Sequence, residues 1–353
     1  MIDAALEWRL VAATSLLTFL LSFLLVGLAR RYFLRRQVLD HPNERSSHSV
    51  PIPKGAGWGL LLALLPAVVL AAWSERMGGI TGVWLQAYGL AMVLAAVSWW
   101  DDLHHLPPLF RLVVQLGVVM VGLGLIYGDR AGQPILPFWS YQVELLMVGF
   151  GWLWFINLYN FMDGIDGVSG SQTLFLSVGM AVLMVAFGKM PDPSFLMMLP
   201  AMAAAAAGFL CWNWPPAKIF LGDVGSVPLG FLMAFFLLKT ASLDKMLWLP
   251  MMILPAYYLA DASVTLLRRL ARREKIWHPH REHFFQLAVR GGLSHAAVVC
   301  RVWILNGFLL TLAWQAPRHP VRAPLAALLA VAGLLGLFYG RWWWYRRRGG
   351  QDG

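Results

Sequence analysis

The sequence predicts an all-α protein of the polytopic membrane class, a helical bundle with about eleven transmembrane helices. Hydrophobic residues make up 59% of the 353 residues and charged residues only 13%. The mean hydropathy is +0.62. Apolar runs of roughly 17 to 25 residues, the length that crosses a bilayer, recur along the whole chain. No stretch is rich enough in linker residues to separate soluble domains, so we expect one membrane domain over residues 1–353.

The candidate spans follow one another with short connections. In chain order they lie near residues 10–29, 57–74, 83–100, 111–127, 141–159, 168–188, 195–213, 224–240, 247–267, 296–316 and 323–345. An odd number of spans places the two termini on opposite sides of the membrane.

Basic residues give the direction of insertion. Most of the 28 Lys and Arg residues fall on one of the two alternating sets of loops, which comprises 30–56, 101–110, 160–167, 214–223, 268–295 and the tail after 345. Lys and Arg in short loops mark the cytoplasmic side. We therefore expect an outer N-terminus, a cytoplasmic C-terminus and an active site at the cytoplasmic face, where four groups of polar residues gather.

The first polar group is the pair Asp101-Asp102, at the end of the third predicted span. Adjacent carboxylates repel each other, so without a cation or a basic partner one of them would have a raised pKa. The alternative is a solvated helix end, since charges at the ends of spans are common.

The second group is the segment Asn157–Gly170, which follows the fifth predicted span. Polar residues recur there at every third position: Asn157, Asn160, Asp163 and Asp166. Gly164 and Gly167 remove side-chain bulk beside the aspartates, which suits the close approach of a phosphate or a metal. The alternative is a glycine-rich turn in which Asn and Asp act as turn formers, with Asn157 only capping the turn.

The third group is Asn213–Ser226, which contains Asp223 between Gly222 and Gly225. Asp223 stands just before an apolar span, so it could cap the N-terminus of a helix. It could equally hold a divalent cation beside main-chain N–H groups that face a phosphate.

The fourth group is the basic loop 268–295, in which His278, His280 and His283 lie close together with Arg281 among them. The arginines of this loop are explained by lipid headgroups at a cytoplasmic surface, but the three histidines are not. A zinc site is disfavoured because no cysteine or nearby set of carboxylates completes it.

Taken together, the four groups combine carboxylates that suit a hard cation with Arg, Lys and His donors that suit phosphate oxygens. Mg²⁺ and a diphosphate fit both halves of this inventory. Phosphoryl transfer needs mainly positioning and neutralisation of charge, which such residues supply. A reaction between soluble molecules would not need eleven spans, so we expect one substrate to be a lipid phosphate and the other a phosphorylated donor from the cytoplasm.

The same residues closely resemble the motifs of the polyprenyl-phosphate N-acetylhexosamine-1-phosphate transferases. The resemblance covers residues 40–295 in order, and residues 296–353 add two further spans and a basic tail. It is carried by Asp40–His48, Pro51–Gly57, Asp101-Asp102 with Arg111–Gln115, Asn160–Gly167, Phe220–Ser226 and His280–His283.

The resemblance implies a glycosyltransferase that moves a sugar 1-phosphate from a UDP-N-acetylhexosamine to undecaprenyl phosphate and releases UMP. It implies Mg²⁺, or Mn²⁺ in its place, and a multi-pass protein of the bacterial inner membrane. The expected partners are the two substrates and the lipid bilayer. A homodimer is compatible with this expectation, and no nucleic acid is expected.

The resemblance also assigns roles to individual residues. Asp223 and Asn160 would bind the metal, and Asp101 and Asp102 would position or deprotonate the lipid phosphate. The second pKa of a phosphate monoester is about 6, so a base would matter only modestly at neutral pH. Three further sets of residues would hold the donor. Asp163 and Asp166 would lie near the nucleoside and metal, and Asn213 and Phe220 at the uracil. The diphosphate or sugar would be held by His280, Arg281, His283 and Lys54.

The order His-Arg-Glu-His at residues 280–283 resembles the branch that starts O-antigen and related surface polysaccharides. The phospho-N-acetylmuramoyl-pentapeptide transferases of peptidoglycan synthesis, the alternative within the family, carry three successive histidines. Outside it, the alternatives are a membrane transporter, because intramembrane aspartates often mark ion paths, and a non-catalytic membrane scaffold. Asp261, in a late span, is explained only as the partner of a neighbouring basic group.

Overall fold

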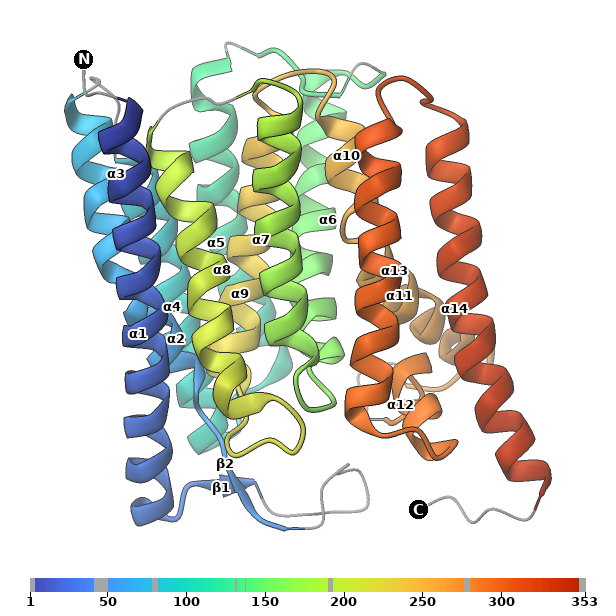
Figure 1. The fold of residues 1–353 in the computed structure, drawn as a ribbon. Coiled ribbons are helices and arrows are strands. Elements are labelled where there is room, and N and C mark those ends of the chain that lie inside the picture. The colour runs from blue at the N-terminus through green and yellow to red at the C-terminus, as the bar shows by residue number, and fades with distance from the viewer. Residues whose placement is uncertain are drawn as a thin grey trace.

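The computed structural model describes residues 4–40, 50–77, 82–130, 132–136, 138–189, 193–275 and 280–348. The described chain is a bundle of long helices that run along one common axis (Figure 1). Helix α1 (Ala4–Arg36) starts at one end of the bundle, and α14 (Arg322–Arg347) finishes at the other. The predicted all-α membrane bundle is therefore confirmed, and its first helix begins at the end of the bundle opposite to that at which its last helix finishes.

The remaining elements connect these two helices in chain order. They are β1 (Leu39–Asp40), β2 (Ile52–Pro53), α2 (Gly57–Ala63), α3 (Leu65–Met77), α4 (Val83–His104), α5 (Pro108–Tyr127), the 3₁₀ turn η1 (Gly128–Arg130), α6 (Tyr141–Met162), α7 (Val168–Ala186), α8 (Pro193–Asn213), α9 (Asp223–Ala241), α10 (Trp248–Ile253), α11 (Ala256–Ala271), α12 (Phe284–Arg290) and α13 (His295–Gln315).

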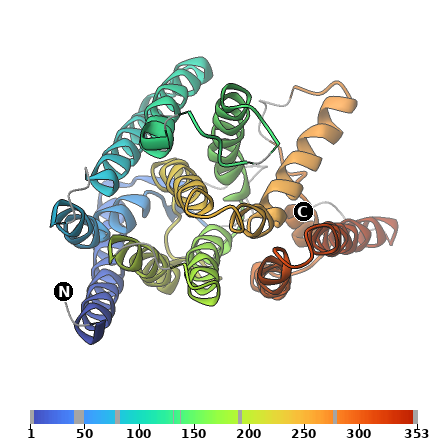
Figure 2. The same ribbon diagram turned by 90° about the horizontal axis from the view of Figure 1, so that it is seen from above.

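Ten stretches of helix in the described residues are long and apolar enough to cross a membrane. The predicted span 247–267 is not one of them, because it is not a single helix. The segment is divided into the short helix α10 and the longer helix α11, with Pro255 at the junction. Proline lacks an N–H group and clashes with the preceding turn, which breaks the helix. After the break, α11 runs outward from the bundle axis (Figure 2).

The second predicted span is bent rather than divided. It consists of α2 and α3, which meet at Leu64, and the two together count as one membrane-crossing stretch over Gly57–Glu75. Pro66 lies in the first turn of α3, where its ring prevents the preceding helix from continuing straight.

Helix α9 lies at the centre of the bundle (Figure 2). Of its most apolar stretch of residues, 89% are buried. Small residues let the neighbouring helices approach it closely. A Cβ at Gly230 would lie 2.9 Å from the Cβ of Tyr159 and 3.0 Å from the Cα of Ile156, both on α6. Because α9 also contacts α2, α4 and α5, its first residue, Asp223, reaches the centre of one end of the bundle.

The first loop is the segment between α1 and α2. A small sheet and its extension join this loop to the start of α9. Strands β1 and β2 pair antiparallel. Beyond β2, the main chain continues along residues 220–221, with Phe220 N donating to Pro53 O at 2.9 Å and Gly57 N to Leu221 O at 3.0 Å. The first loop is thereby held against the segment that carries Asp223.

Candidate active site

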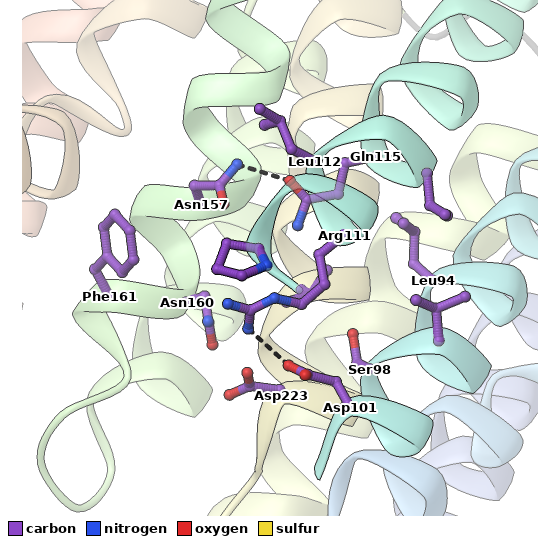
Figure 3. A pocket seen from close by; sticks show the side chains of 14 residues that line it. Leu94, Ser98, Asp101, Arg111, Leu112, Gln115, Asn157, Asn160, Phe161 and Asp223 are labelled. Carbon is purple, nitrogen blue, oxygen red and sulfur yellow. Dashed lines mark hydrogen bonds and ion pairs between the residues drawn. The ribbon is translucent and has the colours of Figure 1, made fainter. Parts of the chain in front are cut away.

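A cavity of about 240 Å³ lies between α4, α5, α6 and α9, at the end of the bundle where the predicted polar groups gather (Figure 3). Apolar side chains form most of its wall, and polar groups gather on one part of it. The polar lining consists of Ser98, Asp101, Arg111, Gln115, Asn157, Asn160 and Asp223. The cavity therefore combines an apolar surface with charged groups, as a phosphorylated lipid would require.

The connection between α4 and α5 fixes Asp101. Helix α4 ends at His104, and the next residue, His105, has a left-handed φ of 52°. Pro108 is the first residue of α5, a position that suits proline. Asp101 Oδ1 accepts a hydrogen bond from Leu106 N at 2.7 Å, and its Oδ2 lies 2.6 Å from Arg111 Nη1. Both carboxylate oxygens of Asp101 are therefore engaged, and the pair presents Arg111 to the cavity.

Asp102 is paired with the first loop instead. Lys54 Nζ lies 2.8 Å from Asp102 Oδ1, and Oδ2 of the same carboxylate is buried without a partner among the described residues. Burial acts to lower the pKa of the Lys54 ammonium, but the hydrogen bond and charge of Asp102 outweigh this effect, so the pKa is raised above its usual value. Lys54 is therefore fully charged at neutral pH.

Asp223 is the carboxylate without a hydrogen-bonding partner. It follows Gly222, whose φ of 75° needs a residue without a side chain, and it lines the cavity beside Asp101 (Figure 3). Within the described chain, no group donates a hydrogen bond to its carboxylate. The charges of Asp101, Asp102, Lys54 and Arg111 all act on it. With Asp223, three carboxylates face two basic groups, which leaves one negative charge in excess.

Asn160 faces this carboxylate cluster from α6. Its Oδ1 accepts a hydrogen bond from Ser226 Oγ at 2.6 Å, which ties α6 to the first turn of α9. An amide oxygen has a second lone pair, so Asn160 can still bind a cation.

Mg²⁺ is held in many phosphate-transferring sites by one or two carboxylates, together with waters and substrate phosphates. Among the described residues, no three His, Cys, Asp or Glu side chains are grouped as a complete metal site. The unpartnered carboxylate of Asp223, the amide oxygen of Asn160 and the buried Oδ2 of Asp102 fit the smaller set of oxygen ligands. The residues present thus suit a hard cation that shares its coordination with a substrate.

Asp163 and Asp166 lie in the turn between α6 and α7, but their surroundings differ. Burial, with the negative charges of Asp223 and Asp166 nearby, raises the pKa of Asp163 to about 7. Asp166 Oδ2 accepts a hydrogen bond from Ala217 N at 3.0 Å and lies 3.2 Å from His295 Nδ1. Asp166 therefore fastens the turn to the 213–222 loop and to the start of α13.

Asn213 holds the other side of the same turn. Its Oδ1 accepts from Gly167 N at 2.9 Å and its Nδ2 donates to Ile219 O at 3.0 Å, and the residue is buried. Both polar atoms of its amide are therefore bound to main chain. The predicted contact of Asn213 with uracil remains a prediction, as does that of Phe220, which is half-buried on the segment paired with the first loop.

The glycines of this turn do not leave open space, contrary to the expectation that they make room for a diphosphate. A Cβ at Gly164 would lie 2.7 Å from Gln286 Nε2 and 3.1 Å from the ring of Phe285. Gly167, with a φ of 76°, lies against Pro215. Protein side chains occupy the space beside both glycines, which allows α12 and the 213–222 loop to pack against the turn.

The histidine segment, residues 280–283, lies at the start of α12 and next to Asp261. The carboxylate of Asp261 accepts hydrogen bonds from Phe284 N at 3.0 Å, Phe285 N at 3.2 Å and Tyr257 Oη at 3.2 Å. It also lies 3.3 Å from His283 Nδ1. Asp261 thus caps the N-terminus of α12. His283 lies beside this carboxylate, and its buried Nδ1 makes no hydrogen bond among the described residues.

His280 and Arg281 are half-buried next to this cap. The ring of His280 lies 4.9 Å from that of His283. Burial, with His283 and Arg269 nearby, lowers the pKa of His280 to about 4, so it is uncharged at neutral pH. Neither histidine lines the cavity, but α12 packs on the turn that carries Asp163. His278 and most of the Asp40–His48 motif lie outside the described residues.

The sequence is similar to those of known proteins over the residues that form this site. A sequence profile described as glycosyl transferase family 4 matches residues 84–241, which include the aspartate pair, the Asn160–Gly167 turn and Asp223. The match covers somewhat less than half of the chain, so over these residues the chain is similar to this family. Several similar curated proteins are named for reactions of undecaprenyl phosphate or decaprenyl phosphate.

Three of the similar proteins show which reactions such proteins are named for. The chain is 27% identical to a probable undecaprenyl-phosphate N-acetylglucosaminyl 1-phosphate transferase of Bacillus subtilis, over 86% of this chain and 84% of the relative. It is 24% identical to a decaprenyl-phosphate N-acetylglucosaminephosphotransferase of Mycobacterium leprae, over 87% and 84%. It is 28% identical to a phospho-N-acetylmuramoyl-pentapeptide-transferase of Kocuria rhizophila, over 82% and 83%.

The structure places Asp101, Asn160 and Asp223 on the wall of one cavity. Asp102 and Lys54 do not line it, but their charges act on Asp223. Arg111 and Gln115, which line the cavity, belong to a motif that carries the resemblance but received no individual role. Arg111 lies ten positions after Asp101, and its charge at the start of a predicted span was a further signal. Gln115 hydrogen-bonds to Asn157 at 2.8 Å, and a single amide within an apolar run gives little indication of a partner.

Proposed function

We propose that this protein transfers an N-acetylhexosamine 1-phosphate from a UDP-sugar to a polyprenyl phosphate, undecaprenyl phosphate in bacteria, with release of UMP. The observation that carries the proposal is the unpartnered carboxylate of Asp223, which faces Arg111 across a cavity walled by membrane helices. The names of the similar proteins from Bacillus subtilis and Mycobacterium leprae support the same chemistry.

In the proposed reaction, an oxygen of the lipid phosphate attacks the phosphorus that carries the sugar. The bond from that phosphorus to the bridging oxygen breaks, and UMP leaves with this oxygen. Arg111 is suited to hold the lipid phosphate, since a guanidinium matches phosphate oxygens geometrically. Asp101 holds Arg111 in place through its 2.6 Å contact. Because a phosphate monoester is largely dianionic at neutral pH, the residues need mainly to orient it.

Asp223 and Asn160, with the free Oδ2 of Asp102, would hold Mg²⁺, which supplies neutralisation of the charge that develops on the diphosphate. Lys54 provides a permanent positive charge at the same end of the cavity. His280 is uncharged at neutral pH and would act as a hydrogen-bonding group toward the donor rather than as a cation.

The proposed location is the bacterial inner membrane, with the cavity end of the bundle in the cytoplasm, where UDP-sugars are found. This is supported by the excess of Lys and Arg in the loops at that end. The proposed pathway is the start of O-antigen or a related surface polysaccharide. It is supported by the order His-Arg-Glu-His at 280–283 in place of three successive histidines.

The test is a donor panel with the purified protein in lipid nanodiscs. Undecaprenyl phosphate is supplied with UDP-N-acetylglucosamine, UDP-N-acetylfucosamine, UDP-N-acetylquinovosamine or UDP-N-acetylmuramoyl-pentapeptide. We expect Mg²⁺-dependent release of UMP and a lipid-diphosphate sugar identified by mass. Product only from the pentapeptide donor would refute the polysaccharide assignment, and solute flux in proteoliposomes without lipid product would refute the transferase.

A matched pair of variants controls for folding. Asp223→Asn should abolish turnover, whereas Asp244→Asn should retain it, because Asp244 pairs with Lys189 between the ends of α7 and α9, at the opposite end of the bundle. Both variants should insert into the membrane and unfold at similar temperatures. Unchanged turnover in folded Asp223→Asn, or in EDTA, would contradict the proposal.

A further inference from the structure

Two pairs of polar residues line the cavity from α5 and α6, one pair deeper than the other, and we call them the inner and the outer rung. The inner rung is the hydrogen bond from Asn157 Nδ2 to Gln115 Oε1, at 2.8 Å. The outer rung consists of Arg111 and Asn160, whose side chains face the cavity from the same two helices (Figure 3). The inner rung is closed by direct contact, while Arg111 and Asn160 contact Asp101 and Ser226 instead of each other.

Helix geometry links the two rungs. Gln115 follows Arg111 by four residues and Asn160 follows Asn157 by three, so each pair lies on one face of its helix. At a rise of about 1.5 Å per residue, the inner rung lies about 5 to 6 Å deeper along the bundle than the outer rung. The separation of α5 and α6 at Gln115 therefore fixes how far Arg111 stands from Asn160.

Deeper in the bundle the two helices also pack directly, with Trp152 of α6 against Gly122 of α5, whereas at its mouth the cavity lies between them. Leu112 and Phe161, which line the cavity beside the outer rung, are 43% and 38% exposed, so the cavity reaches the surface between the two helices. Gln115, by contrast, is only 7% exposed. The same Asn157 Nδ2 also donates to Leu153 O at 2.8 Å, which holds the amide in one orientation on α6.

We infer that Gln115 and Asn157 form a positioning brace, which sets the spacing of Arg111 and Asn160 for the phosphate of the acceptor lipid. The inference rests on the proposed function for its substrate. Neither amide touches the reacting atoms. Because the brace lies between the outer rung and the bundle interior, its loss lets the two helices separate where the lipid phosphate binds, and the affinity for the lipid falls more than the turnover at saturation.

A second hydrogen bond between the same helices provides the control. Tyr127 Oη on α5 donates to Glu144 Oε1 on α6 at 2.6 Å, at the opposite end of the bundle from the cavity. Glu144 also accepts from Ile135 N and Leu136 N, so Tyr127→Phe removes the interhelical bond without leaving the carboxylate unpaired. This variant should lower thermal stability and leave the kinetic constants for the lipid unchanged.

The test measures KM for undecaprenyl phosphate and kcat in four variants. Gln115→Leu and Asn157→Leu should each raise KM about three- to tenfold, the range that an interhelical hydrogen bond carries in membrane proteins, with kcat within about twofold. The exchanged pair Gln115→Asn with Asn157→Gln keeps one long and one short amide and should restore most of the affinity. Tyr127→Phe should have the wild-type KM.

Direct contact of either amide with substrate predicts a different result, in which the exchanged pair is as impaired as the two single leucine variants combined. That result, or an unchanged KM in both leucine variants, would overturn the brace. Absence of lipid product from the wild type with every donor would instead refute the proposed function.

A structural readout tests the brace without turnover. Spin labels at Leu112→Cys and Phe161→Cys, in a chain whose free cysteines Cys211 and Cys300 are replaced by serine, report the distance across the cavity mouth. The distance distribution should be narrow in the parent and in Tyr127→Phe, and broad in Asn157→Leu. An unbroadened distribution in Asn157→Leu would refute the brace whatever the substrate proves to be.

Discussion

Gly57 and Gly225 touch through their main chains: a Cβ added at Gly57 would lie 2.3 Å from the Cα of Gly225. The contact holds the start of α2 against the first turn of α9, two residues after Asp223. Because backbone atoms cannot move aside as a flexible side chain can, the approach requires glycine on both sides. Together with the main-chain hydrogen bonds to residues 220–221, this contact holds the loop that carries Lys54 close to Asp223.

Gly57→Ala should therefore disturb the site as well as the fold. We expect a loss of about 1 to 3 kcal/mol of stability, typical of overpacking, and at least tenfold lower transferase activity, because Lys54 and Asp223 move apart. The check is thermal unfolding in detergent together with the initial rate. Gly151→Ala is the control, since nothing lies within 4 Å of a Cβ at that position. Wild-type rates in Gly57→Ala would contradict the coupling.

The ion pair between Lys54 and Asp102 leads to a second prediction. Lys54→Met leaves the carboxylate of Asp102, of which Oδ2 is already buried without a partner, with no basic neighbour in contact. We expect a fall in activity of at least tenfold and a higher requirement for Mg²⁺, whose charge would have to replace that of the ammonium. Lys54→Arg should retain more activity, because it keeps the charge. Equal activity of the Met and Arg variants would show that the positive charge is not needed.

The fold could be predicted from the sequence to the extent that apolar length decides it. Ten stretches are long and apolar enough, and they appear as helices. Apolar length does not reveal the break within 247–267, because a hydropathy average includes both Pro255 and the charged end of α11. Hydropathy counts apolar residues but carries no information on direction. It therefore cannot show that Asp261 lies on an outward-running helix and caps α12.

The candidate site was predictable as four groups of residues but not as a set of contacts. The type of each side chain indicates what it can bind, whereas only the fold shows what it already binds. Asp223 and Asp166 look alike in the sequence, yet one is without a hydrogen bond and the other accepts one from Ala217 N. The amide of Asn213 is likewise used by main-chain groups, and the glycines of the turn serve close packing.

A pH-dependent stability follows from Asp163, whose pKa is raised to about 7 by burial. In the unfolded chain the pKa returns to its ordinary value near 4. Between these values the folded state binds the extra proton, so the contribution of Asp163 to stability is greatest below pH 4 and is lost as the pH rises through 7. Asp163→Asn removes this dependence.

Thermal unfolding of both proteins in detergent between pH 5 and 8 provides the measurement. The stability of the wild type relative to Asp163→Asn should fall as the pH rises across this range and level off above pH 8. A difference that is independent of pH would show that Asp163 is ionised throughout.

The cap at Asp261 gives the last prediction. Asp261→Asn replaces one of the two carboxylate oxygens by an NH₂ group, so it cannot accept from Phe284 N, Phe285 N and Tyr257 at once. Loss of an N-terminal cap costs about 0.5 to 2 kcal/mol. Because the same carboxylate lies 3.3 Å from His283, we also expect a rise in KM for the UDP-sugar, with little change in KM for the lipid.

Tyr257→Phe removes only one of the three hydrogen bonds and leaves the cap on α12 intact, so it should lower stability without affecting KM for the donor. If both variants changed the two KM values equally, Asp261 would act through general stability alone, and the histidine segment would not be its specific target.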